Sequence, residues 1–223
     1  MLKYNWQKYN KLNSKLSSKI ISFNNSNKIN YIEKGLYNQI RDIFCLTILF
    51  NQKTNGETKI LDYGSNLLAL SNIKSKINSK LFNFSIFDPF YSKKYKDVKK
   101  PFNIKFFTSK DKLKFTNFDI INFGSSLQYI ENIESLSNSI NFRFTKTILI
   151  THTPITLSKK YKSKQKNHKS LIQNVHSLND TKKYFNKIGF NLVFKSRNDD
   201  KYIACEKKEK KTYSLNLIFI KKK

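Results

Sequence analysis

The fold of this chain is decided by residues 59–70, KILDYGSNLLAL, taken together with residues 84–88, FSIFD. The apolar pair that follows the first lysine predicts a short strand, and the polar residues around Gly64 predict a tight turn. Leucines at helical spacing come next, and the second stretch predicts another strand that ends in Asp88. Ligands of open α/β sheets bind beyond the carboxyl ends of the strands, so this unit predicts a binding site at its turn.

The turn and the second strand end have the chemistry of a nucleoside site. Gly64 has no Cβ, so the backbone can approach a ligand closely there. The carboxylate of Asp88 can accept hydrogen bonds from two vicinal ribose hydroxyls. The separation of these two residues is close to the ~20 residues expected between a Rossmann-type turn and its ribose-binding acid. An ordinary βαβ connection that binds nothing is the alternative interpretation.

This unit resembles the cofactor half of the class I S-adenosylmethionine-dependent methyltransferases. In that family one acid ends the first strand, a glycine-rich turn follows, and a second acid ends the second strand; Asp62, Gly64 and Asp88 match these positions. Ser65 and Asn66 stand where further glycines are usual, so the turn departs from the family pattern. The resemblance implies S-adenosylmethionine as cofactor, and it implies a cofactor site made of Asp62, Gly64, Ser65, Asp88, Gly124 and Ser125.

The rest of the chain extends the same pattern to a whole α/β domain. The second strand is predicted to span residues 82–87, directly before Asp88. Further strands are predicted at residues 104–107, 118–123, 147–150, 190–194, 202–205 and 213–220, and helices at 31–50, 67–77, 127–142 and 180–188. Residues 158–169 are rich in lysine and are predicted to form a loop. Ser177 or Asn179 is predicted to cap the last helix, and Gly189 to end it.

The expected fold class is therefore α/β. It is a Rossmann-like class I methyltransferase sheet, mostly parallel with a last antiparallel strand, and with helices on both faces. Residues 1–57 are predicted to form an N-terminal helical extension, and residues 58–223 the methyltransferase-like Rossmann domain. Asp119 begins the predicted fourth strand, so we expect it at the edge of the sheet opposite the cofactor and without a role in binding.

Later segments narrow the resemblance within the family. Residues 118–130, FDIINFGSSLQYI, are similar to its fourth strand and the turn and helix start that follow. Residues 148–154, ILITHTP, are similar to a fifth strand that runs into Thr-Pro, and a Gln-Asn segment follows at residues 173–174. Together these segments resemble bacterial methyltransferases encoded with surface-polysaccharide genes. That resemblance implies a small polar or glycan-linked acceptor, such as a sugar hydroxyl or amine.

Polar side chains at and after the fifth strand are candidates for the acceptor site. His152 ends this strand, and a pKa near neutrality suits it to take a proton from a hydroxyl or amine, so it is the predicted catalytic base. A structural histidine bonded to the backbone is the alternative. His168, Gln173, Asn174 and His176 lie in the segment expected to roof the site, where they are predicted to hydrogen-bond a polar acceptor. Three histidines without a close acidic partner predict no metal site.

The net charge of +28 raises a competing hypothesis, because a strong positive field attracts polyanions nonspecifically. Only Arg41, Arg143 and Arg197 are arginines, the residue that phosphate and base recognition favours. The abundance of lysine, asparagine, isoleucine and phenylalanine is what AT-rich codons supply. An RNA or DNA methyltransferase or nucleic-acid binder is thus an alternative that we do not favour. A catalytically inactive, methyltransferase-like partner protein is a third, suggested by the glycine-poor turn.

The sequence also predicts a compartment. Cys45 and Cys205 fit no disulfide or metal-ligand spacing, which is typical of reduced thiols. The first twenty residues contain no apolar segment of a secretory signal. The longest apolar run, residues 43–50, is far shorter than the ~20 residues that a membrane span needs. We therefore expect a cytoplasmic protein without a membrane span.

Overall fold

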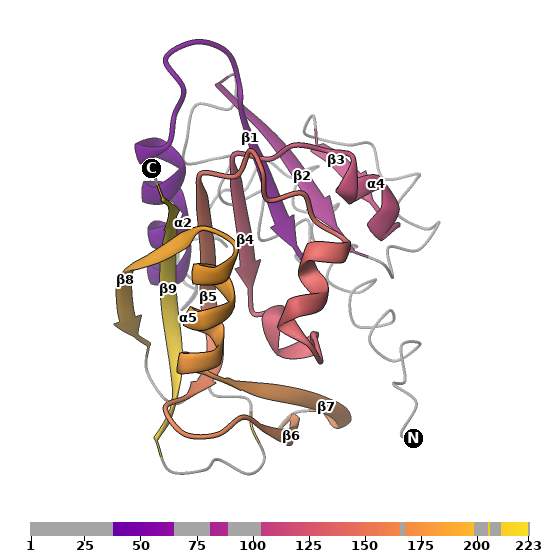
Figure 1. Cartoon of the computed structure of the whole chain (residues 1–223), viewed down its shortest axis with the longest axis vertical. Coiled ribbons are helices and arrows are strands. Elements are labelled where there is room, and N and C mark those ends of the chain that lie inside the picture. The colour runs from indigo at the N-terminus through magenta and orange to yellow at the C-terminus, as the bar shows by residue number, and fades with distance from the viewer. Residues whose placement is uncertain are drawn as a thin grey trace, which may run out of the picture.

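The computed structural model describes residues 38–64, 81–88, 104–165, 168–198, 205 and 211–222. Their elements, in chain order, are α2 (Asn38–Phe50), β1 (Thr58–Tyr63), β2 (Phe82–Phe87), β3 (Ile104–Phe107), α4 (Lys110–Lys114), β4 (Ile120–Gly124), the 3₁₀ helices η4 (Leu127–Tyr129) and η5 (Ile133–Asn138), β5 (Thr147–Thr156), β6 (Tyr161–Gln165), β7 (His168–Ser177), α5 (Leu178–Lys187), β8 (Phe190–Arg197) and β9 (Thr212–Lys221). Figure 1 shows them arranged around one large sheet.

The centre of the sheet is parallel, with strand order β3-β2-β1-β4-β5. β9 then pairs antiparallel with β5, and β8 pairs antiparallel with β9. The prediction of a mostly parallel sheet that ends with an antiparallel strand is confirmed. Because β1, β4 and β5 are neighbours, the turns that leave their carboxyl ends lie at one edge of the sheet.

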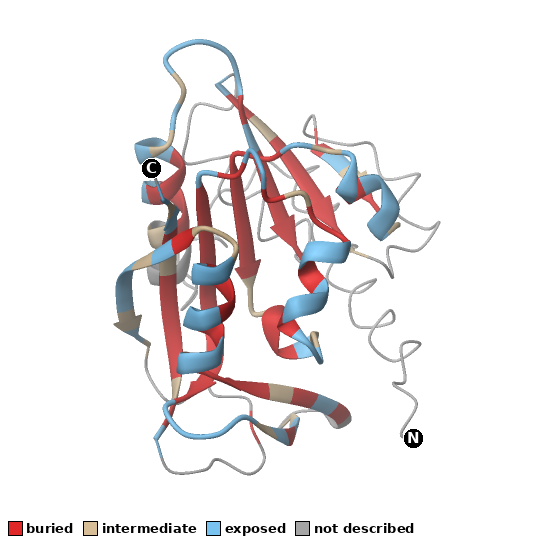
Figure 2. Cartoon of the chain, viewed as in Figure 1, coloured by how far each residue is buried: buried red, intermediate tan, exposed pale blue. Residues whose placement is uncertain are grey.

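Helices cover both faces of this sheet, also as predicted. Alternate strand residues point to opposite faces. On one face, Ile60 of β1 belongs to a core shared with Phe44 and Ile48 of α2. On the other face, its neighbour Leu61 belongs to a core that includes Phe185 of α5 and apolar residues of η4 and η5. Figure 2 shows the central strands buried almost throughout their length, which explains why their sequences are nearly continuous apolar runs.

Several predicted boundaries are confirmed. The strands at residues 82–87 and 104–107 have the predicted ends. The side chain of Ser177 caps α5 by accepting a hydrogen bond from the Asp180 backbone N–H at 3.3 Å. Gly189 ends the same helix with φ 91°, a left-handed conformation that favours glycine.

The single helix predicted over residues 127–142 is wrong, because two short 3₁₀ helices replace it. Ile130 is extended, with φ −94° and ψ 117°, and it ends η4. Asn132 then starts a new turn, since its side-chain oxygen accepts a hydrogen bond from the backbone N–H of Glu134 at 3.0 Å. An asparagine side chain that bonds to nearby backbone in this way competes with a continuous helix.

The loop predicted over residues 158–169 is also wrong. Strand β6 pairs antiparallel with β7 in a hairpin, and the end of β7 pairs parallel with the end of β5 through Ile155–His176 and Thr156–Ser177. Within β6, Ser163 is buried while Lys162 and Lys164 are exposed. The lysines therefore occupy the outer positions of a period-2 strand pattern, and their number hid that pattern in the sequence.

Some predictions fall outside the described residues. These are the helix at 67–77, most of the strand at 202–205 and residues 1–37 of the N-terminal extension; the domain division itself stays a prediction. The described end of that extension is α2, which packs on the sheet. None of the helices in the described segments is both long enough and apolar enough to cross a bilayer.

Candidate functional site

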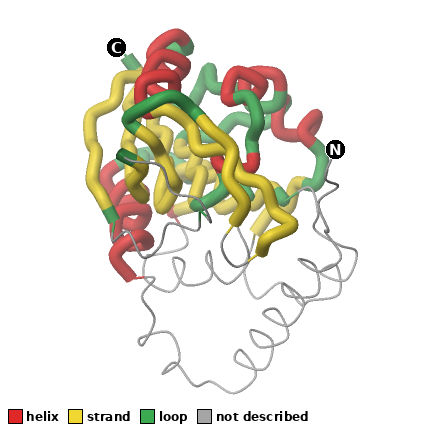
Figure 3. Tube along the Cα trace, turned by 90° about the horizontal axis from the view of Figure 1, so that it is seen from below, coloured by secondary structure: helices red, strands yellow, loops and turns green. Residues whose placement is uncertain are grey.

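The candidate site lies at the carboxyl edge of the sheet. The arrowheads of β1, β2 and β4 mark this edge in Figure 1, and Figure 3 shows the molecule from that side. The parallel register places Asp62 of β1 beside Asn122 of β4, and Gly124 of β4 beside Thr151 of β5. Residues that lie far apart in the sequence are thus brought together where the strands end.

Gly64, which leaves β1, is held against the turn that leaves β4. Its φ is 75°, and its backbone N–H donates to the carbonyl of Phe87 at 2.7 Å. A Cβ built on Gly64 would lie 2.6 Å from the Cβ of Ser126, a distance that real side chains do not reach. Both the backbone conformation and the close approach therefore require glycine.

Asp62 belongs to a buried polar chain across three strands. Its Oδ1 accepts a hydrogen bond from Asn122 Nδ2 at 2.8 Å, and Asn122 Oδ1 accepts one from Thr151 Oγ1 at 3.3 Å. A Cβ on Gly124 would lie 2.9 Å from the same Asn122 nitrogen, so this glycine leaves room for the amide. Asn122 was missed from the sequence, although a polar residue inside an apolar strand is a usable signal.

Asp88 follows β2 at the same edge. It is half-buried, and its backbone N–H donates to the Phe107 carbonyl of β3 at 3.1 Å. It directly follows Phe87, whose carbonyl holds Gly64. Under these two turns the ring of Tyr63 packs 4.6 Å from the ring of Phe87, and burial raises the pKa of the Tyr63 hydroxyl to about 12. Asp88 and the close backbone contact at Gly64 are therefore neighbours, and the packed rings of Tyr63 and Phe87 belong to the same two strand ends.

Ser125 and His152 meet at the ends of β4 and β5. Ser125 Oγ lies 3.0 Å from His152 Nδ1 and 3.0 Å from the backbone oxygen of His152. The two residues have φ values of 51° and 50°, in the left-handed region that non-glycine residues rarely enter. Partial burial lowers the pKa of the His152 imidazole by desolvation, so the neutral ring is favoured at pH 7.

Two buried polar residues that sequence reasoning missed follow β4: Ser126, which lies close to Gly64, and Gln128 of η4. Ser126 Oγ and Gln128 Oε1 have no hydrogen-bond partner among the described residues. Such a buried polar atom costs on the order of 1–3 kcal/mol, and a polar ligand can satisfy it. The signal in the sequence is the cluster of hydroxyl and amide residues directly after Gly124.

The predicted acceptor-site residues lie on β7, beyond the end of β4. Asn174 Nδ2 donates to the Gln128 backbone oxygen at 3.3 Å, and His176 Nε2 lies 3.2 Å from the backbone oxygen of Leu127, so both hold the strand against η4. Gln173 is fully buried and its amide nitrogen donates to Cys205 Sγ at 3.1 Å. That Gln173 contacts an acceptor stays a prediction.

Other predicted residues are placed only in part. The backbone of His168 begins β7, and Ser65 lies outside the described residues. Within the described segments, no three His, Cys, Asp or Glu side chains group in a way that could hold a metal ion. The prediction that His168 and Asn174 contact an acceptor stays a prediction.

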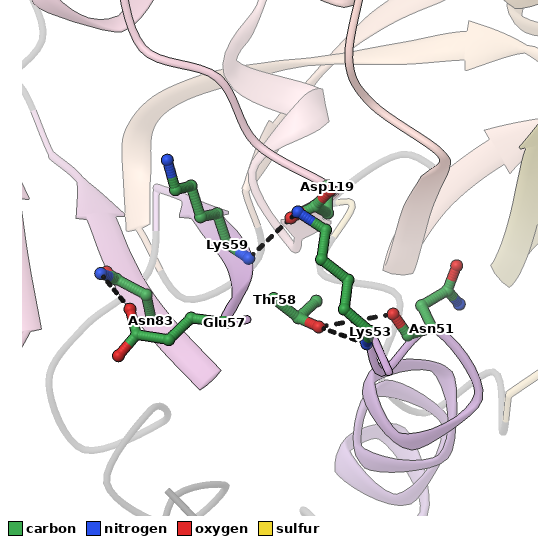
Figure 4. A network of polar contacts seen from close by, with 7 residues as sticks. All are labelled: Asn51, Lys53, Glu57, Thr58, Lys59, Asn83 and Asp119. Carbon is green, nitrogen blue, oxygen red and sulfur yellow. Dashed lines mark hydrogen bonds and ion pairs between the residues drawn. The ribbon is translucent and has the colours of Figure 1, made fainter. Parts of the chain in front are cut away.

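The opposite edge of the sheet holds a structural acid. Asp119 is buried, and its Oδ2 accepts a hydrogen bond from the Lys59 backbone N–H at 2.9 Å and pairs with Lys53 Nζ at 2.8 Å (Figure 4). Thr58 Oγ1 accepts from the Lys53 backbone N–H at 3.0 Å in the same network. Asp119 therefore joins the amino ends of β1 and β4 and the loop after α2, far from the candidate site.

The structure is similar to solved structures although its sequence is not similar to characterised ones. No protein-family model matches the chain, and no curated protein matches it. One structural neighbour is the 1,6-didemethyltoxoflavin-N1-methyltransferase of Burkholderia thailandensis, with 1,6-didemethyltoxoflavin and S-adenosylhomocysteine bound: 10% identity, 100% of this chain and 92% of that chain covered, TM-score 0.54. Another is an S-adenosylmethionine-dependent methyltransferase of Mesorhizobium loti: 13% identity, 84% and 100% covered, TM-score 0.54.

A third neighbour is the [4+2]-cyclase SpnF, with 9% identity, 81% of each chain covered and a TM-score of 0.56. At such low identities these likenesses show the fold, which is the Rossmann-like fold of class I methyltransferases. The cyclase is also a reason to argue function from the site, because neighbours of this fold include more than methyltransferases.

Proposed function

We propose that this protein is an S-adenosylmethionine-dependent methyltransferase. The observation that carries the proposal is the contact between the turns after β1 and β4, where Gly64 leaves no room for a Cβ against Ser126. This contact places a bare stretch of backbone beside Asp62 and Asp88, at the edge where ligands of this fold class bind. The neighbour from Burkholderia thailandensis carries S-adenosylhomocysteine, the product that such an enzyme would release.

The residues present fit the cofactor chemically. In this proposal Asp88 accepts hydrogen bonds from the ribose hydroxyls, and the buried Ser126 Oγ and Gln128 Oε1 are further polar groups that a ligand can satisfy. Asp62 is bonded to Asn122, so its role is to shape the turn. Ser65 keeps its predicted place in the cofactor site. S-adenosylmethionine supplies an electrophilic methyl group on a sulfonium, and the chain contributes in-line positioning of the nucleophile and modest base help.

The acceptor in this proposal is a small polar molecule, with a sugar hydroxyl or an amine as the first class to test. Its support is the similarity of residues 118–130 and 148–154 to methyltransferases encoded with surface-polysaccharide genes. Two features of the site suit such an acceptor: the imidazole of His152 at the end of β5, and the hydrogen-bonding residues of β7 beyond the end of β4. We place the reaction in the cytoplasm, where the free cysteines Cys45 and Cys205 would stay reduced.

Calorimetric titration with S-adenosylmethionine and S-adenosylhomocysteine tests the proposal. We expect micromolar binding of both, which corresponds to about −7 to −8 kcal/mol. Flat titrations for both ligands at high protein concentration would contradict it. They would leave the interpretation of a catalytically inactive, methyltransferase-like partner protein.

Nucleic acid as the substrate is the alternative that the net charge of +28 favours. Arg143 lies over the ring of Phe144, and Arg197 lies over the ring of Tyr213. We therefore attribute polyanion binding to the lysines. Binding to single-stranded DNA should then weaken steeply as sodium chloride rises, by roughly 300-fold or more between 50 and 200 mM if six or more phosphates are neutralised. Steep salt dependence together with methyl label on RNA would favour the alternative, whereas steep dependence without label would indicate nonspecific binding.

A further inference from the structure

The contact between Ser125 and His152 bears on which nitrogen of the imidazole carries the proton. Ser125 Oγ lies within hydrogen-bond distance of two atoms of the same residue, the ring nitrogen Nδ1 and the backbone oxygen, each at 3.0 Å. A serine hydroxyl has one hydrogen to donate and lone pairs with which to accept. The backbone oxygen can only accept. Both contacts are hydrogen bonds only if the hydroxyl donates to the backbone oxygen and accepts from Nδ1–H.

The backbone around this pair is held in an unfavourable conformation. Among the described residues, three that are not glycine have positive φ, and two of these are Ser125 and His152. A left-handed conformation is unfavourable for such a residue and persists only where surrounding contacts hold it. Here the Ser125 backbone N–H donates to Thr151 O at 2.9 Å, and the His152 backbone N–H donates to Asn216 Oδ1 at 3.0 Å.

Asn216 is itself fixed from the other side. It is buried in β9, and its side chain exchanges two hydrogen bonds with the amide of Asn198, at 3.0 and 2.7 Å. The β5–β9 pairing shifts register between Ile150 and Thr153, so His152 sits in a bulge that this amide supports. Bulges next to sites commonly re-aim a side chain. Hydrogen bonds from the end of β4, from β5 and from β9 thus hold the backbone and the ring of His152.

We infer that Ser125 is the positioning residue of His152: it holds the ring as the neutral Nδ1–H tautomer, so that Nε2 is the nitrogen that takes the proton of the methyl acceptor. In a neutral imidazole, the hydrogen bond made by one ring nitrogen decides which nitrogen carries the proton. This assignment moves Ser125 from the cofactor, where the family resemblance put it, to the base. Burial lowers the pKa of the His152 imidazole, which agrees with a neutral ring.

The step rests on the proposed function. The acceptor's oxygen or nitrogen forms a bond to the methyl carbon, the methyl–sulfur bond breaks, and S-adenosylhomocysteine leaves with that electron pair. The acceptor's proton passes to Nε2 of His152. The ring is then an imidazolium with a proton on each of its two nitrogens. The new Nε2–H later loses its proton to water, while Nδ1–H stays on Ser125. Only one tautomer can do this, because the other already has a proton on Nε2.

Nuclear magnetic resonance of the ¹⁵N-labelled full chain tests the inference without any cofactor. The chain has three histidines, so long-range ¹H–¹⁵N correlation spectra of the imidazoles are simple, and His152→Gln identifies the signals of His152. We expect a protonated Nδ1 and an unprotonated Nε2 for His152 at pH 7.5. His176 is a second reference signal, because its Nε2 lies 3.2 Å from the Leu127 carbonyl oxygen, a contact that is a hydrogen bond only when Nε2 carries the proton.

The variants are Ser125→Ala and Ser125→Gly. Both remove the hydroxyl, and glycine also tolerates the positive φ, so it keeps the test valid if the alanine variant does not fold. We expect the protonated Nδ1 signal of His152 to be lost and a protonated Nε2 signal to appear. Ser139→Ala is the matched control: this buried serine also donates to a backbone carbonyl, that of Leu136 at 3.2 Å, a bond within its own 3₁₀ turn. It should leave the His152 signals unchanged.

Two results would overturn the inference: a protonated Nε2 on His152 in the unaltered chain, or an unchanged tautomer in folded Ser125→Gly. Neither result depends on whether S-adenosylmethionine binds, so failure of the proposed function in the calorimeter is a separate outcome. If the enzyme is active, Ser125→Gly should lower kcat about tenfold or more and change KM for the cofactor little. A general base contributes about 10²–10⁴-fold, and only part of it depends on the tautomer.

Discussion

Gly64 and Gly56 have similar left-handed backbones, with φ of 75° and 82°, but different surroundings. A Cβ at Gly64 would meet Ser126 at 2.6 Å, whereas a Cβ at Gly56 would meet nothing within 4 Å. Gly56→Ala should therefore cost only backbone strain, about 1–2 kcal/mol. Gly64→Ala should cost about 2–5 kcal/mol, because roughly 1–3 kcal/mol of overpacking is added to the same strain. Urea unfolding of the two variants measures the difference.

Equal losses in the two glycine variants would show that the turns after β1 and β4 separate readily. A rescue is available, because Ser126→Gly removes the Cβ that the new methyl group would strike. The double variant should recover the steric part of the loss and leave the backbone strain. If it recovers nothing, the close contact that carries the proposed function is not tight in solution.

Asp88 is the residue that we propose to bind the ribose of the cofactor. If its carboxylate accepts the ribose hydroxyls, Asp88→Ala removes charge-assisted hydrogen bonds worth about 1.5–3 kcal/mol. Affinity for S-adenosylhomocysteine should then fall about ten- to a hundredfold, measured by calorimetry. Glu57→Ala is the control: Glu57 is an exposed acid before β1, at the amino edge, where it accepts from Asn83 at 3.2 Å. Unchanged affinity in Asp88→Ala would remove the ribose assignment.

At the scale of elements, Asp119 fastens β4 to β1 and to the loop after α2. Its predicted position at the edge of the sheet opposite the cofactor turn agrees with the structure. The residue contributes to the fold, because it accepts hydrogen bonds from the Lys59 backbone and from Lys53. Asp119→Ala should lower the free energy of unfolding by about 1.5–3 kcal/mol, since buried donors lose a charged partner. The matched control is Asp111→Ala, an exposed acid in α4 whose loss changes the net charge equally.

Urea unfolding at one ionic strength compares these two aspartate variants. A loss in Asp111→Ala as large as that in Asp119→Ala would mean that net charge, rather than the hydrogen bonds, governs the effect. Calorimetry on folded Asp119→Ala should still show cofactor binding, because the network lies at the edge opposite Gly64 (Figure 4).

The longest central element, β5, connects the sheet to the candidate site. Its first half is a buried parallel strand beside β4, and its last residues pair with β7. The bulge at His152 lies between these two parts. The hairpin of β6 and β7 thereby lies beyond the end of β4 and is bonded to η4 through Asn174 and His176. The length of β5 therefore brings the hairpin of β6 and β7, with its predicted acceptor-binding residues, to the carboxyl edge of the sheet.

At the scale of the whole molecule, two partly or fully buried histidines make stability depend on pH. Burial is the largest cause that lowers the pKa of both His152 and His176 below the ordinary value of 6.5. Below pH 6.5 the unfolded chain binds protons that the folded chain does not, so folding stability is complete above that pH and falls as the pH drops through the folded pKa values. Urea midpoints between pH 5 and 8 should show this decline.

The double variant His152→Gln, His176→Gln separates these histidines from the carboxylates. Its urea midpoint should change less between pH 7.5 and 5.5 than that of the unaltered chain, even if the variant is less stable throughout. A parallel decline in both proteins would assign the acid sensitivity to other groups. Ionic strength is kept constant, because a net charge of +28 makes the stability of the folded state sensitive to salt.

The sequence by itself determined the central strands, the cap at Ser177 and the stop at Gly189. These features depend on local physics: apolar runs of strand length, a hydroxyl that bonds a nearby backbone N–H, and a residue without Cβ at a left-handed position. It also identified Gly64 and Asp88 at one edge of the sheet, because the carboxyl ends of parallel strands share an edge. Local patterns suffice where each residue's environment follows from its neighbours in the chain.

Only the tertiary structure decided which of the polar residues act together. Three contacts join residues of different strands or of the turns that follow them. Ser125 contacts His152, Asn216 accepts from the His152 backbone, and Asn122 donates to Asp62. The same is true of the hairpin that makes a strand of the lysine-rich residues 161–165, and of Asp119, whose partners come from β1 and the preceding loop. Hydrogen bonds between strands depend on register, and register is set when the whole sheet packs against its helices.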